Sequence, residues 1–262
     1  MEYAFLAVLF IYLTAALFYI LRLVFGYAKF SAIGLRCVVL GAVVQLTVLV
    51  IHLIRLQGTV SLGYLEYFQL SSLFLAILFI VLCFSKRFYG SGPFFITLIV
   101  VFCLLSFSLH TPSMLSQLTR GSGYLLLHMV FLFLSLVVFS VSFVVAIMFL
   151  LSEWQIKQKR LKGITARFPP LQVLDHVHYR SLYTGFVLFT LVIITGAGFA
   201  KIKTGHYISA DLKQVLGIVS WLFFAALLNL RAGKGLSGHR GVVLSLIGCV
   251  SIIISFILGF SR

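Results

Sequence analysis

The chain has 262 residues, of which 62% are hydrophobic and only 10% charged, and its formal net charge is +15. Soluble domains contain about 45–50% apolar and about 25% charged residues, and a soluble fold of this length has too little interior to bury so much apolar surface. The composition therefore excludes a soluble globular protein and predicts an all-α polytopic membrane protein in contact with lipid. The basic residues crowd the predicted helix ends, so membrane topology accounts for the charge and we expect no nucleic-acid partner.

Apolar stretches of spanning length, about 17–25 residues, recur along the whole chain. They lie near 3–25, 36–56, 65–85, 93–110, 124–152, 181–200, 212–230 and 241–260. This pattern predicts about eight transmembrane helices in a single transmembrane domain over 1–262, with breaks at clusters of Gly, Pro, Ser and charge. The first stretch is too long for a signal peptide and lacks a small-residue cleavage site, so we expect it to remain as the first span.

The distribution of Lys and Arg predicts the orientation, because cytoplasmic loops of membrane proteins carry an excess of them. Fourteen of the 20 follow the first, third, fifth and seventh spans: Arg22, Lys29, Arg36, Lys86, Arg87, Lys157, Lys159, Arg160, Lys162, Arg167, Arg180, Arg231, Lys234 and Arg240. The remaining six lie on the other side: Arg55, Arg120, Lys201, Lys203, Lys213 and Arg262. We therefore expect a multi-pass protein of the bacterial inner (cytoplasmic) membrane with both termini outside.

The predicted cytoplasmic loop at 153–180 is the longest and most basic of these loops. Anchoring by the positive-inside effect accounts for its charge, and binding of anionic lipid or a cytosolic partner is the alternative.

Few residues can carry chemistry. The acidic residues are Glu2, Glu66, Glu153, Asp175 and Asp211. No two of them have a spacing suited to general acid–base catalysis, and the chain has no Gly-rich phosphate loop or Ser/His/Asp grouping. The four cysteines lie in apolar runs without CxxC spacing, which indicates neither a disulfide framework nor covalent haem attachment. Hydrolysis and phosphoryl transfer are therefore not expected.

The seven histidines are the remaining candidates, because an ionisable residue inside a bilayer is costly and suggests a function. Neutral imidazole is a common axial ligand of haem iron. On the predicted topology, His52, His110, His128 and His206 lie towards the outer face, as an external haem pocket between helices requires. We take His128 and His52 as the first candidates for the iron. A hydrogen-bonded packing residue or an interfacial anchor is the alternative for each.

On the predicted cytoplasmic side, His178 leads directly into the sixth span and could ligate at a second site, whereas His176 and His239 are expected to be solvated loop residues. Near His206, the amines of Lys201, Lys203 and Lys213 are candidate partners for haem propionates. Snorkelling of these side chains to the membrane interface is the alternative.

Several motifs recur in an order that resembles a known family. The segment 174–186 (LDHVHYRSLYTGF) leads into a span ending at 195–201 (TGAGFAK), and Asp211-Leu-Lys213 and 218–222 (IVSWL) follow it. Upstream lies 127–130 (LHMV). This order is similar to that of the CcsA/CcmC/CcmF cytochrome c assembly superfamily, most strongly over 124–241. The segment around His52 and 62–65 (LGYL) is more similar to its short eight-span branch, the HemX-type and YpjD-type proteins.

The resemblance implies haem held non-covalently, as haem b, at the outer face, where histidines flank a Trp-rich loop. His128 matches the external histidine before that loop, the loop corresponds to about 201–215, and Asp211 and Lys213 match its Asp and Lys. The sequence departs from the family in this loop, which has no tryptophan, and Asn229 stands where a histidine ends the following span. A second iron ligand must then come from elsewhere, and His52 is the first choice.

Three functions follow from these observations. The first is a haem-binding protein of cytochrome c biogenesis that presents haem at the outer face. It would need a partner subunit of the assembly system and would not be an enzyme on its own, although a partial haem lyase-type subunit is compatible with the resemblance. The second is a HemX-like regulator acting on a cytosolic enzyme of tetrapyrrole synthesis, without haem delivery. The third is an unrelated transporter, which the lack of inverted repeats and of paired acids in the spans disfavours.

Overall fold

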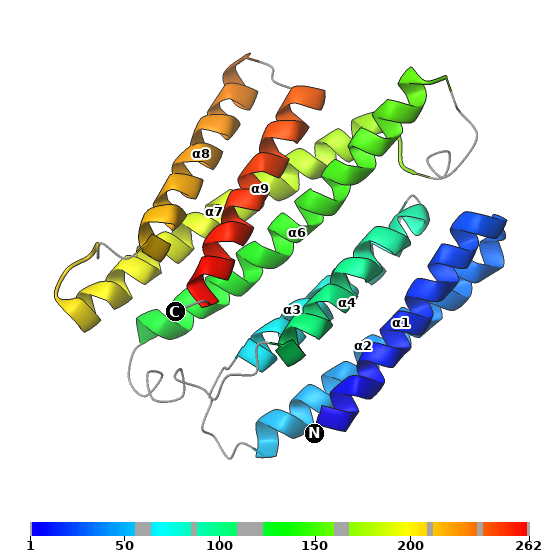
Figure 1. The fold of residues 1–262 in the computed structure, drawn as a ribbon, viewed down its shortest axis with the longest axis horizontal. Coiled ribbons are helices and arrows are strands. Elements are labelled where there is room, and N and C mark those ends of the chain that lie inside the picture. The colour runs from blue at the N-terminus through cyan, green and yellow to red at the C-terminus, as the bar shows by residue number, and fades with distance from the viewer. Residues whose placement is uncertain are drawn as a thin grey trace. The chain divides into compact units, whose positions relative to one another are not determined.

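The computed structural model describes residues 2–55, 64–84, 88–108, 123–159, 168–208, 212–234 and 238–260. The chain divides into two compact units. Unit 1 comprises Met1–Arg120 and Arg160–Pro169, and unit 2 comprises Gly121–Lys159 and Pro170–Arg262. Within the described residues each unit contains four long helices, and each is considered by itself below (Figure 1).

Unit 1 contains the first four helices in chain order. They are α1 (Glu2–Phe25), α2 (Ala28–Arg55), α3 (Tyr64–Phe84) and α4 (Gly92–Ser108), and a 3₁₀ turn, η1 (Tyr89–Ser91), precedes the last of them. The chain reverses between α1 and α2 within two residues. Gly26 takes φ of +81° there, a left-handed conformation that side chains disfavour.

Unit 2 contains α6 (Gly123–Lys157), α7 (Leu171–Thr204), α8 (Leu212–Lys234) and α9 (His239–Phe260). The two longest helices, α6 with 35 residues and α7 with 34, pack against each other along their length (Figure 1). At 1.5 Å per residue each is about 50 Å long, which exceeds a hydrocarbon core of about 30 Å. Both helices therefore continue beyond the apolar part of the membrane.

The prediction of an all-α polytopic membrane protein is confirmed. Six of the described helices are long and apolar enough to cross a membrane, and two shorter apolar helices cover Gly92–Phe107 and His239–Ser251. The helices coincide with the eight predicted spans, but several of them are longer than predicted. Helix α2 begins at Ala28 rather than at 36, and α7 begins at Leu171 rather than at 181. Helix α8 continues through Arg231 to Lys234, which were expected in a loop.

The predicted cytoplasmic loop at 153–180 is consequently much shorter than expected. Its first residues complete α6 as far as Lys157, and its last ten residues form the first turns of α7. Hydropathy marks the part of a helix that lies in hydrocarbon, whereas the backbone hydrogen bonds extend the helix through polar residues on either side.

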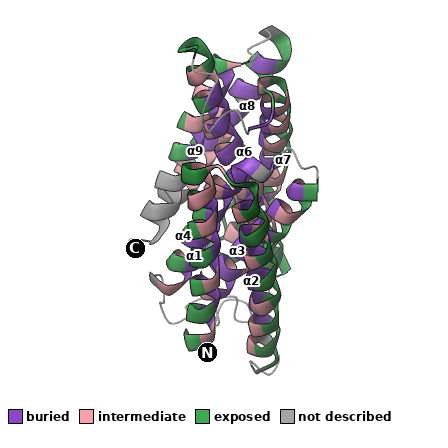
Figure 2. Cartoon of the chain, turned by 90° about the vertical axis from the view of Figure 1, so that its right-hand side faces the viewer, coloured by how far each residue is buried: buried purple, intermediate pink, exposed green. Residues whose placement is uncertain are grey.

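The outward surfaces of the helices are apolar, as contact with lipid requires. Helix α2, for example, exposes Val39, Leu40, Val43, Leu46 and Ile54. Figure 2 shows exposed residues along α2 and buried residues on the inner sides of the helices. Because the solvent for these surfaces is lipid, an exposed aliphatic side chain carries no penalty here.

The interior of unit 1 is held by a buried network of polar side chains. The Tyr12 hydroxyl of α1 donates to Oε1 of Gln45 on α2 at 2.8 Å. Nε2 of Gln45 donates to Oε1 of Gln69 on α3 at 2.6 Å and lies 2.7 Å from Oγ of Ser72. Gln69 Nε2 then donates to Oγ of Ser106 on α4 at 2.8 Å. Four helices are thus joined by one chain of bonds, since polar groups without water must find partners within the protein.

The interior of unit 2 is instead packed with aromatic rings. Phe139 of α6 and Phe224 of α8 have ring centroids 5.0 Å apart, in a cluster with Leu182 of α7. Between α7 and α8, Trp221 of α8 stacks on Phe186 of α7 with ring centroids 5.7 Å apart. Helix α7, which carries most of the motif residues, thus packs against both α6 and α8.

We expect Gln69→Leu to destabilise unit 1, because the substitution removes the Gln69 Oε1 acceptor of the Gln45 amide and the Gln69 amide donor to Ser106. The expected loss of unfolding free energy is about 1–2 kcal/mol. A titration from mild detergent into SDS measures it. Thr47→Val is the matched control, since the Thr47 hydroxyl is exposed and bonds only the Val43 carbonyl of its own helix. Equal midpoints for the two variants would contradict the role of the network.

Candidate functional site

His128 lies in the second turn of α6, at the end predicted to be outside, and its ring is half-buried against α7. Its Nδ1 lies 2.9 Å from the backbone carbonyl oxygen of Val192. A carbonyl oxygen only accepts, so Nδ1 must carry the proton and donate it. The lone pair of the neutral ring is then on Nε2, for which no hydrogen bond occurs among the described residues.

This arrangement fits the requirements of a haem ligand. Metal-binding histidines usually donate the second ring nitrogen to a carbonyl or carboxylate, which sets the tautomer and the ring orientation. The Val192 carbonyl provides that contact to His128, and the opposite nitrogen is the one that would reach iron. The described structure thus contains one imidazole, that of His128, with Nδ1 protonated and the lone pair of Nε2 available for a metal.

Beyond His128, α7 projects to the predicted outer side and ends in an exposed tip. Lys201 Nζ donates to the Tyr207 hydroxyl at 2.6 Å and lies 4.3 Å from the centre of its ring. Gln214 Nε2 of α8 donates to the Tyr207 carbonyl at 3.0 Å. These bonds tie the tip to the start of α8 and leave Lys203 and His206 exposed beside it.

The other predicted residues of this region are only partly described. Lys213 lies in the first turn of α8. Asp211 and His110 lie outside the described residues, so their predicted roles stay predictions.

His52 lies in α2 and therefore belongs to unit 1, whereas His128 belongs to unit 2. His52 Nε2 lies 2.8 Å from Oε1 of Glu66 on α3, and Phe5 of α1 meets the ring edge-on at 6.1 Å. A carboxylate partner holds the proton on Nε2. The neutral His52 ring would then present Nδ1, and its ligation of iron stays a prediction.

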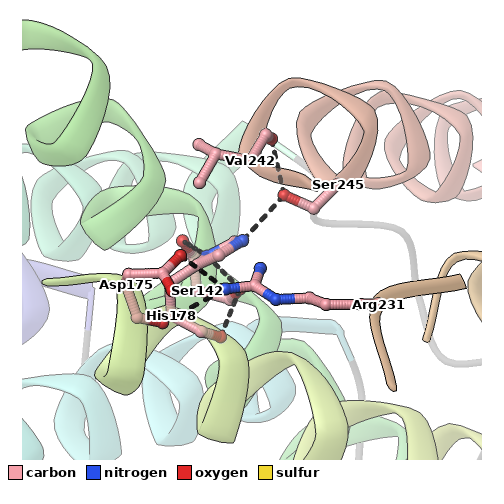
Figure 3. Close-up of polar contacts among 6 residues, drawn as sticks. All are labelled: Ser142, Asp175, His178, Arg231, Val242 and Ser245. Atoms are coloured by element: carbon pink, nitrogen blue, oxygen red, sulfur yellow. Dashed lines mark hydrogen bonds and ion pairs between the residues drawn. The ribbon is translucent and has the colours of Figure 1, made fainter. Parts of the chain in front are cut away.

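His178 lies at the centre of a buried polar cluster in the first half of α7 and is 1% exposed. Its Nδ1 lies 3.1 Å from the carbonyl oxygen and 3.0 Å from Oγ of Ser142 on α6. Its Nε2 lies 2.9 Å from Oγ of Ser245 on α9 (Figure 3). Both nitrogens are therefore engaged in joining three helices, and ligation of iron by His178 would have to break one of these contacts.

A buried ion pair lies beside this cluster. Arg231 of α8, expected in a cytoplasmic loop, is buried and donates Nη2 to Oδ1 of Asp175 on α7. Its guanidinium carbon also lies 4.8 Å from the centre of the Tyr179 ring. Nη1 has no partner among the described residues. The pair fixes α8 to the beginning of α7, where the predicted motif 174–186 starts.

His176 and His239 also differ from the expectation of loop residues. His176 is exposed but lies within α7. His239 begins α9, and its Nδ1 lies 2.7 Å from Oε2 of Glu153 on α6.

Four partners were not assigned from the sequence. Glu66, Ser142 and Ser245 contact histidines from other helices, and Arg231 was counted only as a basic residue of a loop. The acids Glu66 and Asp175 could have pointed to these partners. An acidic side chain is rare in so apolar a chain and needs a partner when it is buried. Nothing in the local sequence distinguishes Ser142 or Ser245 from the other serines of their helices.

We expect Asp175→Ala to lower the unfolding free energy by about 2 kcal/mol, because it leaves the Arg231 guanidinium buried without its counter-ion, while partial exposure of Asp175 limits the loss. Detergent-to-SDS unfolding measures the change. Glu153→Ala is the matched control, because it removes an α6 carboxylate whose partners Lys157 and His239 are both largely exposed. A larger loss for the control than for Asp175→Ala would contradict the importance of the buried pair.

Comparisons with known proteins identify the family. A family model described as cytochrome C assembly protein matches residues 3–261, a range that runs through both units. The cytochrome c biogenesis protein CcsA of Prochlorococcus marinus subsp. pastoris is 40% identical over 90 residues, which cover 34% of this chain and 29% of that protein. The CcsA of Guillardia theta is 29% identical over 219 residues, which cover 73% of each chain.

The chain thus spans less than a third of the length of the Prochlorococcus relative that it matches. No solved structure matches. Because the family model covers nearly the whole chain, this multi-span membrane protein belongs to the cytochrome c assembly protein family.

Proposed function

We propose that this protein handles haem during cytochrome c assembly, in the bacterial inner membrane, and presents it at the outer face. The observation that carries the proposal is the state of His128: Nδ1 is anchored on the Val192 carbonyl and Nε2 is left to bind iron. Family membership and the names of the relatives, which are cytochrome c biogenesis proteins, support the choice of haem as the ligand.

The residues around His128 would divide the binding between them. Nε2 of His128 would hold the iron of a non-covalently bound haem b. The exposed amine of Lys203 is the candidate partner for a propionate, whereas the Lys201 amine is already bonded to Tyr207. Haem bound here would supply the iron porphyrin that cytochrome c receives, and the chain's own part is to hold, orient and release it.

For the second axial position the sequence makes His52 the first choice. Its ring is held by Glu66 as the His128 ring is held by Val192, so both imidazoles have one fixed nitrogen. A histidine from a partner subunit of the assembly system is the alternative for this position.

A second candidate function is a HemX-like regulator of a cytosolic enzyme of tetrapyrrole synthesis. The observation that favours it is the segment 201–215, where the resemblance led us to expect a Trp-rich loop and the sequence has no tryptophan. In this case no haem is bound, and the basic connection between α6 and α7 is the contact surface.

We expect the protein purified in mild detergent from haem-sufficient membranes to show sharp reduced-minus-oxidised and pyridine haemochrome bands. His128→Ala should abolish or strongly weaken them, because it removes an axial ligand. His52→Ala should shift them towards a five-coordinate spectrum. His176→Ala is the control, since His176 is exposed on α7 at the opposite, predicted cytoplasmic end.

Two results would contradict the proposal: haem spectra unchanged in His128→Ala, or no haem under conditions that load a known family member. Deletion of the gene separates the two functions. Haem handling predicts less holo-cytochrome c, whereas regulation predicts altered porphyrin precursors with cytochrome c intact.

A further inference from the structure

We propose that Gly196 of α7 is a positioning residue that keeps the Val192 carbonyl open to His128 and so sets the tautomer of that histidine. The consequence for iron rests on the proposed function. The consequence for the imidazole itself does not, because it concerns the protein without haem.

The contact that carries this inference is unusually close. A β-carbon at position 196 would lie 3.0 Å from Nδ1 and 3.0 Å from Cε1 of His128. Such distances are shorter than nearly all real contacts of a β-carbon. The His128 ring therefore occupies the space that any side chain at this position would need.

The position of Gly196 relative to Val192 explains why the space matters. The two residues are four apart, so they lie one above the other on the same face of α7. The carbonyl of Val192 points along the helix axis towards residue 196. A side chain there would stand beside the line along which Nδ1 of His128 reaches that carbonyl, 2.9 Å away.

Other glycines of α7 provide a comparison. A β-carbon at Gly198 would lie 2.7 Å from the Tyr124 ring, one turn before His128 on α6. That clash is closer, but the Tyr124 side chain is half exposed and can move outward. His128 cannot move without lengthening its hydrogen bond, so alanine has a specific effect only at position 196.

The hydroxyl of Thr195 does not replace this contact. Its Oγ1 lies 2.6 Å from the Leu191 carbonyl oxygen and 3.2 Å from that of Val192, so its single proton favours Leu191. The Nδ1–H of His128 is therefore the stronger side-chain donor to Val192, and the tautomer of His128 depends on access to it.

The test is ¹⁵N NMR of histidine-labelled protein in lipid bilayers without haem, with His128→Gln to assign the His128 signals. The wild type should show His128 as the Nδ1–H tautomer, and Gly196→Ala should convert a substantial part of it to the Nε2–H form. Gly198→Ala is the matched control and should leave the tautomer unchanged. Alanine is the better helix former, so weakening of α7 itself would not explain a change.

Haem affinity gives the second measurement. Loss of a contact that orients a metal-binding histidine lowers metal affinity by about 10- to 100-fold. We expect a loss in that range for Gly196→Ala and less than a twofold change for Gly198→Ala.

Three results would overturn the inference. They are a wild-type His128 protonated on Nε2, a tautomer unchanged by Gly196→Ala, and an equal change in Gly198→Ala. The first needs no substitution at position 196, so the inference remains testable even if Gly196→Ala fails to fold. If the wild type binds no haem but His128 shows the predicted tautomer in each protein, the proposed function is contradicted and the role of Gly196 is supported.

Discussion

The absence of water from the bilayer core is the constraint on which the rest of this structure depends. A polar group without a partner in hydrocarbon costs several kcal/mol, so buried polar side chains are driven to find partners within the protein. Unit 1 does this with the chain of bonds from Tyr12 to Ser106, and unit 2 does it around His178 and Arg231. These bonds join helices distant in sequence, so satisfying the polar groups also fixes which helices pack together.

The same constraint distinguishes the histidines from one another. His178 uses both ring nitrogens to join α6, α7 and α9, as expected for a residue whose role is packing. His128 uses one nitrogen and presents the other, at a half-buried position near the end of a helix. An imidazole with one fixed and one open nitrogen is suited to bind a metal.

Sequence analysis found the helices, but not the contacts between them. Hydropathy detects the length of chain in hydrocarbon, so it located the eight apolar helices of the described residues and missed the first turns of α2 and α7. His128 was singled out because a motif marks it. Arg231 was misplaced because a count of basic residues treats each as solvated, and only the packing of α8 on α7 shows that it is buried beside Asp175. The role of Gly196 could not be predicted from the sequence for the same reason, because the residue that it contacts, His128, lies on another helix.

The departure from the Trp-rich loop has a consequence for the proposed function. Aromatic side chains contribute large apolar contact areas to a bound ligand, and the segment 201–215 offers Tyr207 as its one aromatic residue. Haem held at His128 would therefore depend more on the iron–imidazole bond than on contacts with the porphyrin face. The orientation of the ring then controls a larger share of the affinity, and a carbonyl and a glycine on α7 control that orientation. A site built in this way would release haem more readily than one with an aromatic cradle, which suits a protein that passes haem on rather than keeping it.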